Sequence, residues 1–300
     1  MQASNLGPGP RGSTRFLRVG TALTAAAWGL FLLLCWQITL LQSLRMDPRA
    51  GLAWIIAVSA ALLLVYIWAP RRRRARARLR VRSPGRAWPW LLAMTPAFAL
   101  LPQALWVALQ AFGLAHDPPP QKELEAFIAK PFGEPAFWLL AIGAAPLLEE
   151  FGFRGWIQRP LERGFGAMPA IAASAGLFAL AHGEPELMPV RLAAGLVLGH
   201  AVWASRSIWS SVLLHLSWNL GAIGLDAVAH DVDATNKGWQ WGVPAAAVTA
   251  LCLLVCAWAV RRMQDAADRF AHLGFGLAEP LSFGQPLAAG PWSAHELVGL

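Results

Sequence analysis

Long apolar segments separated by short polar ones recur along most of the chain, and they constrain its fold more than any other feature. A bilayer core requires about 20 apolar residues per helix. We therefore expect about eight transmembrane helices, at 19–43, 51–69, 88–113, 136–157, 167–183, 188–205, 208–229 and 241–260. Only 14% of the residues are charged and 56% are hydrophobic, so one water-soluble core could not bury this surface. The sequence predicts an all-α, polytopic membrane helix bundle.

The basic residues lie mostly in alternate loops. The run "RRRRARARLRVR" (71–82) directly follows the second apolar segment, and Arg159 and Arg163 follow the fourth. Loops rich in Arg and Lys stay on the cytoplasmic side, so both termini are expected there. Such loops also contact anionic lipid headgroups, so we expect membrane lipid, and no nucleic acid, as the partner of this charge. The Ala- and Arg-rich composition suggests a bacterial inner membrane. Cys35, Cys252 and Cys256 lie inside apolar segments and are expected to be small core residues.

Two adjacent glutamates lie inside the apolar segment 136–157, in "LLEEFGFRG" (147–155). An ionisable side chain there costs roughly 2.5–3.5 kcal/mol on insertion scales and usually faces the bundle interior. Glu150 and Arg154 are four residues apart and are expected to form an ion pair on one helix face. Glu149 points about 100° away from Glu150 and has no partner on its own helix. It must meet a polar group of another helix, meet water, or stay protonated.

Two later apolar segments carry histidine. "FALAH" (178–182) puts Phe178 and His182 on one helix face, and "HLSWN" (215–219) does the same for His215 and Asn219. A single histidine in a span is more often a hydrogen-bonded packing residue than a catalytic one. Together with Glu149, however, two imidazoles and an amide can activate a water and stabilise an oxyanion.

A pair of glycines lies between these two motifs. Gly195 and Gly199 in "GLVLG" (195–199) have the small-xxx-small spacing that lets membrane helices approach closely. We expect them to serve helix packing. His200 follows directly, and a structural role is expected for it.

In this order, on successive apolar segments, these motifs resemble the CPBP family of intramembrane proteases, which includes type II CAAX prenyl endopeptidases and bacteriocin-processing relatives. The family pattern of EExxxR, FxxxH and HxxxN is matched by Glu149-Glu150-Arg154, Phe178-His182 and His215-Asn219. The resemblance implies that Glu149 takes a proton from the attacking water with the aid of His182. It implies that His215 and Asn219 stabilise the oxyanion, and that Glu150, Arg154 and Phe178 support the site. One departure is Ser205-Arg206-Ser207, where relatives often have a Thr-Gly-type turn.

This reading implies an intramembrane endopeptidase acting on a hydrophobic or membrane-anchored peptide, and a division of the chain. We expect a cytoplasmic N-terminal segment (1–18), N-terminal transmembrane helices (19–135) with a basic loop (71–86), a catalytic four-helix core (136–229), a last transmembrane helix (230–262) and a cytoplasmic tail (263–300). Regular helices would place Glu149 and His182 about 10–15 Å apart in depth. A kink at Pro146 is expected to reduce this separation.

A metal site is an alternative use of the same residues. Glu149, His182 and His215 make a His₂Glu set of the type found in some catalytic zinc sites. The chain has no HExxH motif, and the three residues come from three different helices. We expect a glutamate mechanism with no cofactor, with zinc as the alternative.

Two other classes of function also fit. Glutamate and histidine inside spans are the parts of a proton relay, as in a proton-coupled membrane transporter. Transporters often carry corresponding polar features in two halves of the chain. Here these residues cluster in 136–229 without counterparts in the earlier spans. The other alternative is a non-catalytic membrane scaffold of the same fold.

Overall fold

The computed structural model describes residues 11–68, 80–81, 83–116, 122–229 and 239–272, and within them the chain is helical and contains no strand. The α-helices are α1 (Arg11–Leu44), α2 (Pro48–Trp68), α4 (Trp88–Ala111), α5 (Lys122–Ile128), α6 (Gly133–Trp138), α7 (Ala145–Glu150), α8 (Arg159–Phe165), α9 (Ala167–Ala181), α10 (Met188–Ser205), α11 (Ile208–Ala229) and α13 (Trp239–His272). Short 3₁₀ helices cover Gly85–Ala87 (η1) and Pro185–Leu187 (η4), and π-helical segments cover Leu139–Ala144 (η2) and Phe151–Gln158 (η3).

Seven helical segments in the described part of the chain are long and apolar enough to cross a membrane. The predicted all-α polytopic membrane bundle is therefore confirmed. The predicted span at 167–183 corresponds to α9, an apolar helix of 15 residues that is shorter than these seven segments. Much of the basic loop, the loop at 230–238, residues 1–10 and the tail from 273 lie outside the described residues.

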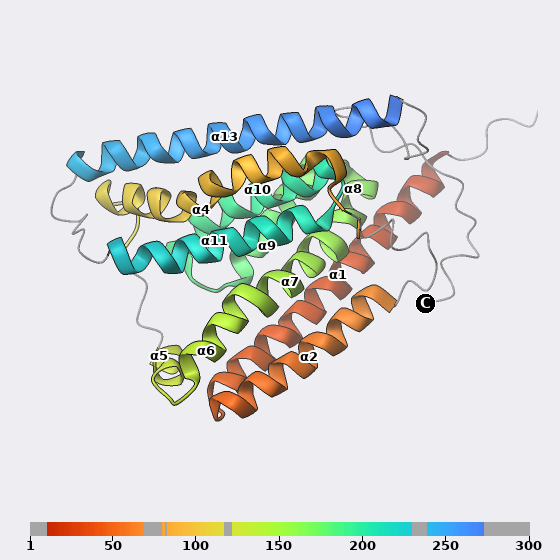
Figure 1. Cartoon of the computed structure of the whole chain (residues 1–300). Coiled ribbons are helices and arrows are strands. Elements are labelled where there is room, and N and C mark those ends of the chain that lie inside the picture. Colours follow the sequence, from red (N-terminus) through yellow and green to blue (C-terminus); the bar gives the residue numbers. More distant parts are fainter. Residues whose placement is uncertain (1–10, 69–79, 82, 117–121, 230–238, 273–300) are drawn as a thin grey trace, which may run out of the picture.

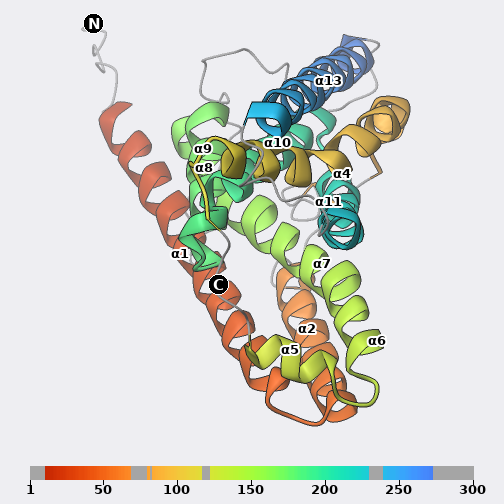
Figure 2. The same cartoon turned by 90° about the vertical axis from the view of Figure 1, so that its left-hand side faces the viewer.

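The helices form two groups that cross each other (Figure 1). In one group, α4 packs between α13 and α11, and α10 contacts α9, α11 and α13. In the other group, α1 packs along α2, η3 and α8. Seen from the side, α1 and α2 run away from the α13 layer, and α5 lies at their far end (Figure 2). The segment Gly133–Phe165 contacts both groups and carries the two glutamates.

This segment is one continuous run of helical turns from Gly133 to Phe165. We expected the helix to end at 157 and Arg159 and Arg163 to lie in a loop, which is wrong. Pro160 lies in the first turn of α8, where a proline is tolerated. Arg159 pairs with Glu162 over 2.8 Å, so its charge is compensated on the helix.

The longer helix also removes the expected depth mismatch. The chain reverses at Gly166, which has a φ of +90°, and α9 runs back along α8. Glu149 and His182 lie almost equally far along the chain from Gly166, so they reach the same level. A kink at Pro146 is not needed to bring them together.

Pro146 has a different consequence, because the turn before it is π-helical. In the i→i−5 register, residue 146 would donate its N–H to the carbonyl of Ala141, but proline has no N–H. Asn219 of α11 donates its Nδ2 to this carbonyl over 2.7 Å. In the second π-helical segment, the Ser174 hydroxyl of α9 donates to the Phe153 carbonyl over 3.0 Å. Side chains of other helices thus satisfy backbone carbonyls of the widened turns, as a membrane interior requires.

Helix α13 continues past residue 262 to His272, because its inner face keeps an apolar stripe. The buried residues of this stripe recur at three- and four-residue spacing: Cys252, Cys256, Ala259, Met263 and Ala266. Beyond them, Asp268 pairs with Arg206 over 3.2 Å and ties the end of α13 to the turn before α11. All three cysteines are free thiols, and Cys35 is half-buried.

Candidate active site

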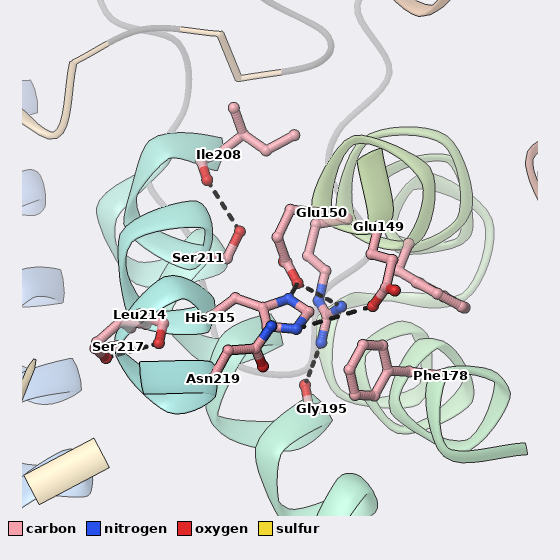
Figure 3. A network of polar contacts seen from close by, with 12 residues as sticks. Glu149, Glu150, Phe178, Gly195, Ile208, Ser211, Leu214, His215, Ser217 and Asn219 are labelled. Atoms are coloured by element: carbon pink, nitrogen blue, oxygen red, sulfur yellow. Dashed lines mark hydrogen bonds and ion pairs between the residues drawn. The ribbon is translucent and has the colours of Figure 1, made fainter. Parts of the chain in front are cut away.

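The carboxylate of Glu149 faces the imidazole of His215 (Figure 3), and the imidazole of His182 approaches the same carboxylate from another helix. Its Oε2 lies 3.7 Å from Nε2 of His182, at the end of α9, and 3.8 Å from Nε2 of His215, on α11. These separations are longer than a hydrogen bond, and the buried Oε2 has no hydrogen-bond partner among the residues that the structure describes. The structure thus brings together three groups from α7, α9 and α11 around one buried carboxylate oxygen.

The second nitrogen of each imidazole is held by an acceptor. His182 Nδ1 lies 2.7 Å from the Phe178 carbonyl, and His215 Nδ1 lies 2.8 Å from Oε1 of Glu150. A carbonyl or carboxylate oxygen only accepts, so we assign the proton of each neutral ring to Nδ1. Both Nε2 atoms are then proton acceptors that face Glu149.

Glu150 is fully buried and holds two partners through one oxygen. Its Oε1 accepts from Arg154 over 3.0 Å and from His215 over 2.8 Å. The ion pair with Arg154 follows the predicted i, i+4 geometry. The bond to His215 was not predicted, and it connects the pair to the site.

Arg154 ties α10 to the site. Its Nη2 donates to the Gly195 carbonyl over 3.2 Å, and its guanidinium lies 4.8 Å above the ring of Phe178. The Phe178 ring also meets the rings of His182 and His215, with centroids 4.8 and 5.6 Å away. Phe178 therefore packs against both imidazoles and the guanidinium of Arg154.

Asn219 lies at the edge of the site, one turn beyond His215 on α11 (Figure 3). One of its N–H groups donates to the Ala141 carbonyl, as described above. A carboxamide has two N–H groups. Asn219 thus has a backbone role that the sequence did not indicate, and keeps a second donor for another acceptor.

Gly195 and Gly199 lie at close helix contacts. A Cβ on Gly195 would come within 2.9 Å of Cα of Ala175 on α9, and one on Gly199 would come within 2.9 Å of Oε1 of Gln158. Because these side chains are missing, the helices lie close together, and the carbonyls of both glycines accept hydrogen bonds from side chains of η3. His200 lies outside this cluster, and its Nδ1 is 2.8 Å from the Leu196 carbonyl of its own helix.

A second buried polar cluster continues from the site toward the end of α8 and was missed from the sequence. Gln158 donates to the Gly199 carbonyl over 3.0 Å and to Glu162 over 2.9 Å. Glu162 also pairs with Arg80 over 3.0 Å. Burial lowers the pKa of Arg80 to about 9, against the attraction of Glu162, which raises it. The four-residue spacing of Glu150, Arg154, Gln158 and Glu162 was the signal for this stripe; Arg80 had none.

The turn at Ser205-Arg206-Ser207 contains no glycine and is stabilised by side-chain hydrogen bonds. Arg206 has a φ of +56°, a conformation that favours glycine. The Ser205 hydroxyl donates to the Ala201 carbonyl over 2.6 Å and accepts the backbone N–H of Ser207 over 3.2 Å. Ser210 donates to the same hydroxyl over 2.8 Å. These contacts stabilise the turn that sets the start of α11, and hence the position of His215.

Among the residues that the structure describes, no group of three His, Cys, Asp or Glu side chains is arranged to hold a metal ion. The donor set of Glu149, His182 and His215 nevertheless has one feature of zinc sites. Histidines that bind zinc usually donate their other N–H to a carbonyl or carboxylate, as both Nδ1 atoms do here.

Fold and site together define a polytopic membrane protein with a buried carboxylate–imidazole centre. Residues 131–221 match the family model described as type II CAAX prenyl endopeptidase Rce1-like. This stretch contains all three motifs, so the resemblance to the CPBP family is confirmed over these residues. Searches of curated proteins and of solved structures each found no match.

Proposed function

We propose that this protein is an intramembrane endopeptidase that hydrolyses a peptide bond of a membrane-anchored or hydrophobic peptide. The observation that carries the proposal is the buried Oε2 of Glu149, which faces Nε2 of both His182 and His215 within 3.8 Å. The Rce1-like match over residues 131–221 supports the same class of reaction. A buried carboxylate beside an imidazole can accept the proton of an attacking water, as general-base catalysis requires.

In the proposed mechanism Glu149 is the general base. It takes a proton from the water that attacks the scissile carbonyl, and His182 accepts a hydrogen bond from the same water through Nε2. Glu149 then returns that proton to the leaving amine as the C–N bond breaks. The bond from His182 Nδ1 to the Phe178 carbonyl supports this assignment, because it keeps the proton away from Nε2. Burial strengthens these contacts, since the site lies in a low-dielectric environment.

His215 and Asn219 stabilise the oxyanion in this mechanism. An acceptor Nε2 cannot do this, so His215 acts as an imidazolium, with protons on both nitrogens. The carboxylate of Glu150 accepts the Nδ1 proton over 2.8 Å and so holds the ring with Nε2 toward Glu149. Asn219 contributes the N–H that Ala141 does not use. Glu150 thereby acts through His215 as a positioning residue.

We propose that the reaction uses no metal. Zinc is the alternative, because both Nδ1 atoms are bonded as in zinc-binding histidines. Glu149, His182 and His215 would hold the ion, which would activate water as a Lewis acid. Metal analysis of purified protein, with hydrolysis assayed in chelator, distinguishes the two. Stoichiometric zinc together with hydrolysis lost in chelator would overturn the metal-free mechanism.

Hydrolysis is tested on purified protein in liposomes with an internally quenched peptide ending in a Cys-aliphatic-aliphatic-X sequence, with and without an S-farnesyl group. We expect Glu149→Gln, His182→Ala and His215→Ala each to lower kcat at least about 100-fold. His200→Ala is the matched control for His182→Ala, because both rings bond the carbonyl four residues earlier. Unchanged hydrolysis by Glu149→Gln would refute the mechanism. If the wild type does not hydrolyse the peptide and the same three variants change its proton flux, the protein is a transporter.

We further propose a bacterial inner membrane with both termini on the cytoplasmic side, which requires the short helix α9 to be an eighth crossing. The basic run 71–82 and the arginines before the first span support this orientation. Cysteine labelling of intact cells tests it, with single cysteines placed at Ser13 and at Asp117. Only the cysteine at position 117 should react with an impermeant reagent from outside; the reverse pattern would contradict the orientation.

A further inference from the structure

The N-terminal helix α1 lies outside the stretch that matches the protease family, yet it covers the π-helical segment that carries Arg154. A Cβ on Gly152 would come within 2.6 Å of the Leu33 side chain. A Cβ on Gly29 would come within 2.9 Å of Cβ of Trp156. Glycine on each helix thus meets a larger side chain on the other. Contacts this close fix α1 against the site in one register.

One polar side chain of α1 reaches the end of α9. Nε2 of Gln37 donates to the Ala181 carbonyl over 2.9 Å. It lies one residue beyond Trp36, which is 1% exposed and donates to the Ser59 hydroxyl of α2 over 3.2 Å. Gln37 therefore follows a residue that burial and a hydrogen bond fix against α2.

The Ala181 carbonyl belongs to the peptide bond that leads into His182. The last carbonyls of a helix have no partner within it, so their orientation depends on what binds them. At the end of α9, the Phe178 carbonyl is bonded by Nδ1 of His182, and the Leu180 carbonyl accepts the backbone N–H of Gly183 over 3.1 Å. The Ala181 carbonyl accepts the side-chain N–H of Gln37. Gln37 is the contact that comes from another helix, so it ties the backbone at His182 to the rest of the bundle.

We propose that Gln37 is a positioning residue of the active site, which holds His182 at its distance from Glu149. The proposal deepens the proposed function and rests on it where catalysis is measured. Gln37 acts through the Ala181–His182 peptide bond, so losing it lets the end of α9 rotate and moves His182 Nε2 relative to Oε2 of Glu149. Substrate binding is not affected, because Gln37 bonds the backbone of α9 and not the substrate.

Two substitutions remove the bond with little change in the helix. Gln37→Met keeps the length of the side chain without a donor, and Gln37→Asn keeps the carboxamide but is one methylene too short. Thr39→Val is the matched control, because the Thr39 hydroxyl bonds the Cys35 carbonyl within α1 itself. We expect both Gln37 variants to lower kcat by about ten-fold with KM unchanged, and the control to leave both constants unchanged. An increase in KM alone would mean that Gln37 binds substrate, and would overturn the proposal.

A second measurement does not depend on hydrolysis. The imidazole ¹⁵N resonances of His182 are recorded in detergent micelles and assigned by their absence in His182→Gln. We expect Gln37→Met and Gln37→Asn to shift the His182 resonances and to leave those of His200 in place. His182 resonances that coincide with those of the wild type would overturn the proposal. If the wild type fails to hydrolyse the quenched peptide, the proposed function falls, while the resonances still decide the role of Gln37.

Discussion

The imidazole of His215 donates its Nδ1 proton to Glu150 over 2.8 Å, although the two residues are 65 positions apart in the chain. The same carboxylate oxygen accepts from Arg154 over 3.0 Å. Glu150 is thus more than the neutral partner of an arginine on its own helix. It connects a buried ion pair to one of the two histidines that face Glu149.

Replacement of Glu150 by glutamine tests this connection. The amide keeps the shape of the carboxylate but removes the negative charge that accepts the Nδ1 proton of His215. We expect kcat on the quenched peptide to fall by about 100-fold, with KM little changed. The thermal unfolding temperature in detergent reports whether the variant folds. A well-folded variant with a kcat within twofold of the wild type would contradict the role given to Glu150.

Arg154→Met should act first on stability. It leaves Glu150 charged and fully buried without its cation, which costs about 3–5 kcal/mol when one partner of a buried pair is removed. The double variant with Glu150→Gln removes both charges and should recover most of the free energy of unfolding, measured by denaturation in mixed micelles. Hydrolysis should stay low in both variants. Equal stability of the single and double variants would show that the pair is not coupled.

The Ala141 carbonyl allows a test by two substitutions. Asn219→Leu leaves this carbonyl without its donor, which costs about 1–3 kcal/mol. Pro146→Ala restores a backbone N–H at the position that the π-helical register requires. We expect the free energy of unfolding lost by Asn219→Leu to be smaller in the Pro146→Ala background. Hydrolysis should not recover, because the oxyanion donor is still absent. Strictly additive stability changes would contradict the shared carbonyl.

The contact between α10 and α9 predicts a loss of stability for a substitution at one glycine and not at another. The Cβ of Gly195→Ala would lie 2.9 Å from the Cα of Ala175, and backbone cannot move aside as a flexible side chain can. We expect this variant to lose about 1–3 kcal/mol of stability and to weaken the bond from Arg154 to the Gly195 carbonyl. Gly176→Ala is the control on α9, because a Cβ there meets nothing within 4 Å. Loss of stability in the control alone would contradict the proposed packing.

The sequence predicted the three motifs on separate helices because each motif is local. Glu149, His182 and His215 could be recognised from charge or imidazole inside apolar segments. The bond between Glu150 and His215 could not, because it depends on how α7 and α11 face each other. The end of the fourth span was also predicted wrongly. Arg159 was interpreted as a loop charge, whereas Glu162 on the next turn compensates it within a helix.

Arg80 and Gln37 show two different reasons for a missed residue. Arg80 lies at the end of a run of arginines, and nothing in its neighbourhood distinguishes it from the others. Its partner Glu162 is on a helix far along the chain. Gln37, in contrast, is a single carboxamide in an apolar segment, and that is a visible signal. Its role follows only from the position of Ala181, which is set by the packing of α1 against η3 and α8.

The need of Ala141 for a donor from Asn219 also affects how the protein is made. The segment Gly133–Phe165 precedes α11 in the chain, so it is synthesised before the Asn219 donor of this carbonyl. An unpaired backbone carbonyl in lipid is costly, which favours a nascent segment that stays near the insertion machinery. Arrival of α11 supplies both Asn219 and His215 to the same place. Completion of the active site and release of a finished membrane bundle therefore become one step of biogenesis.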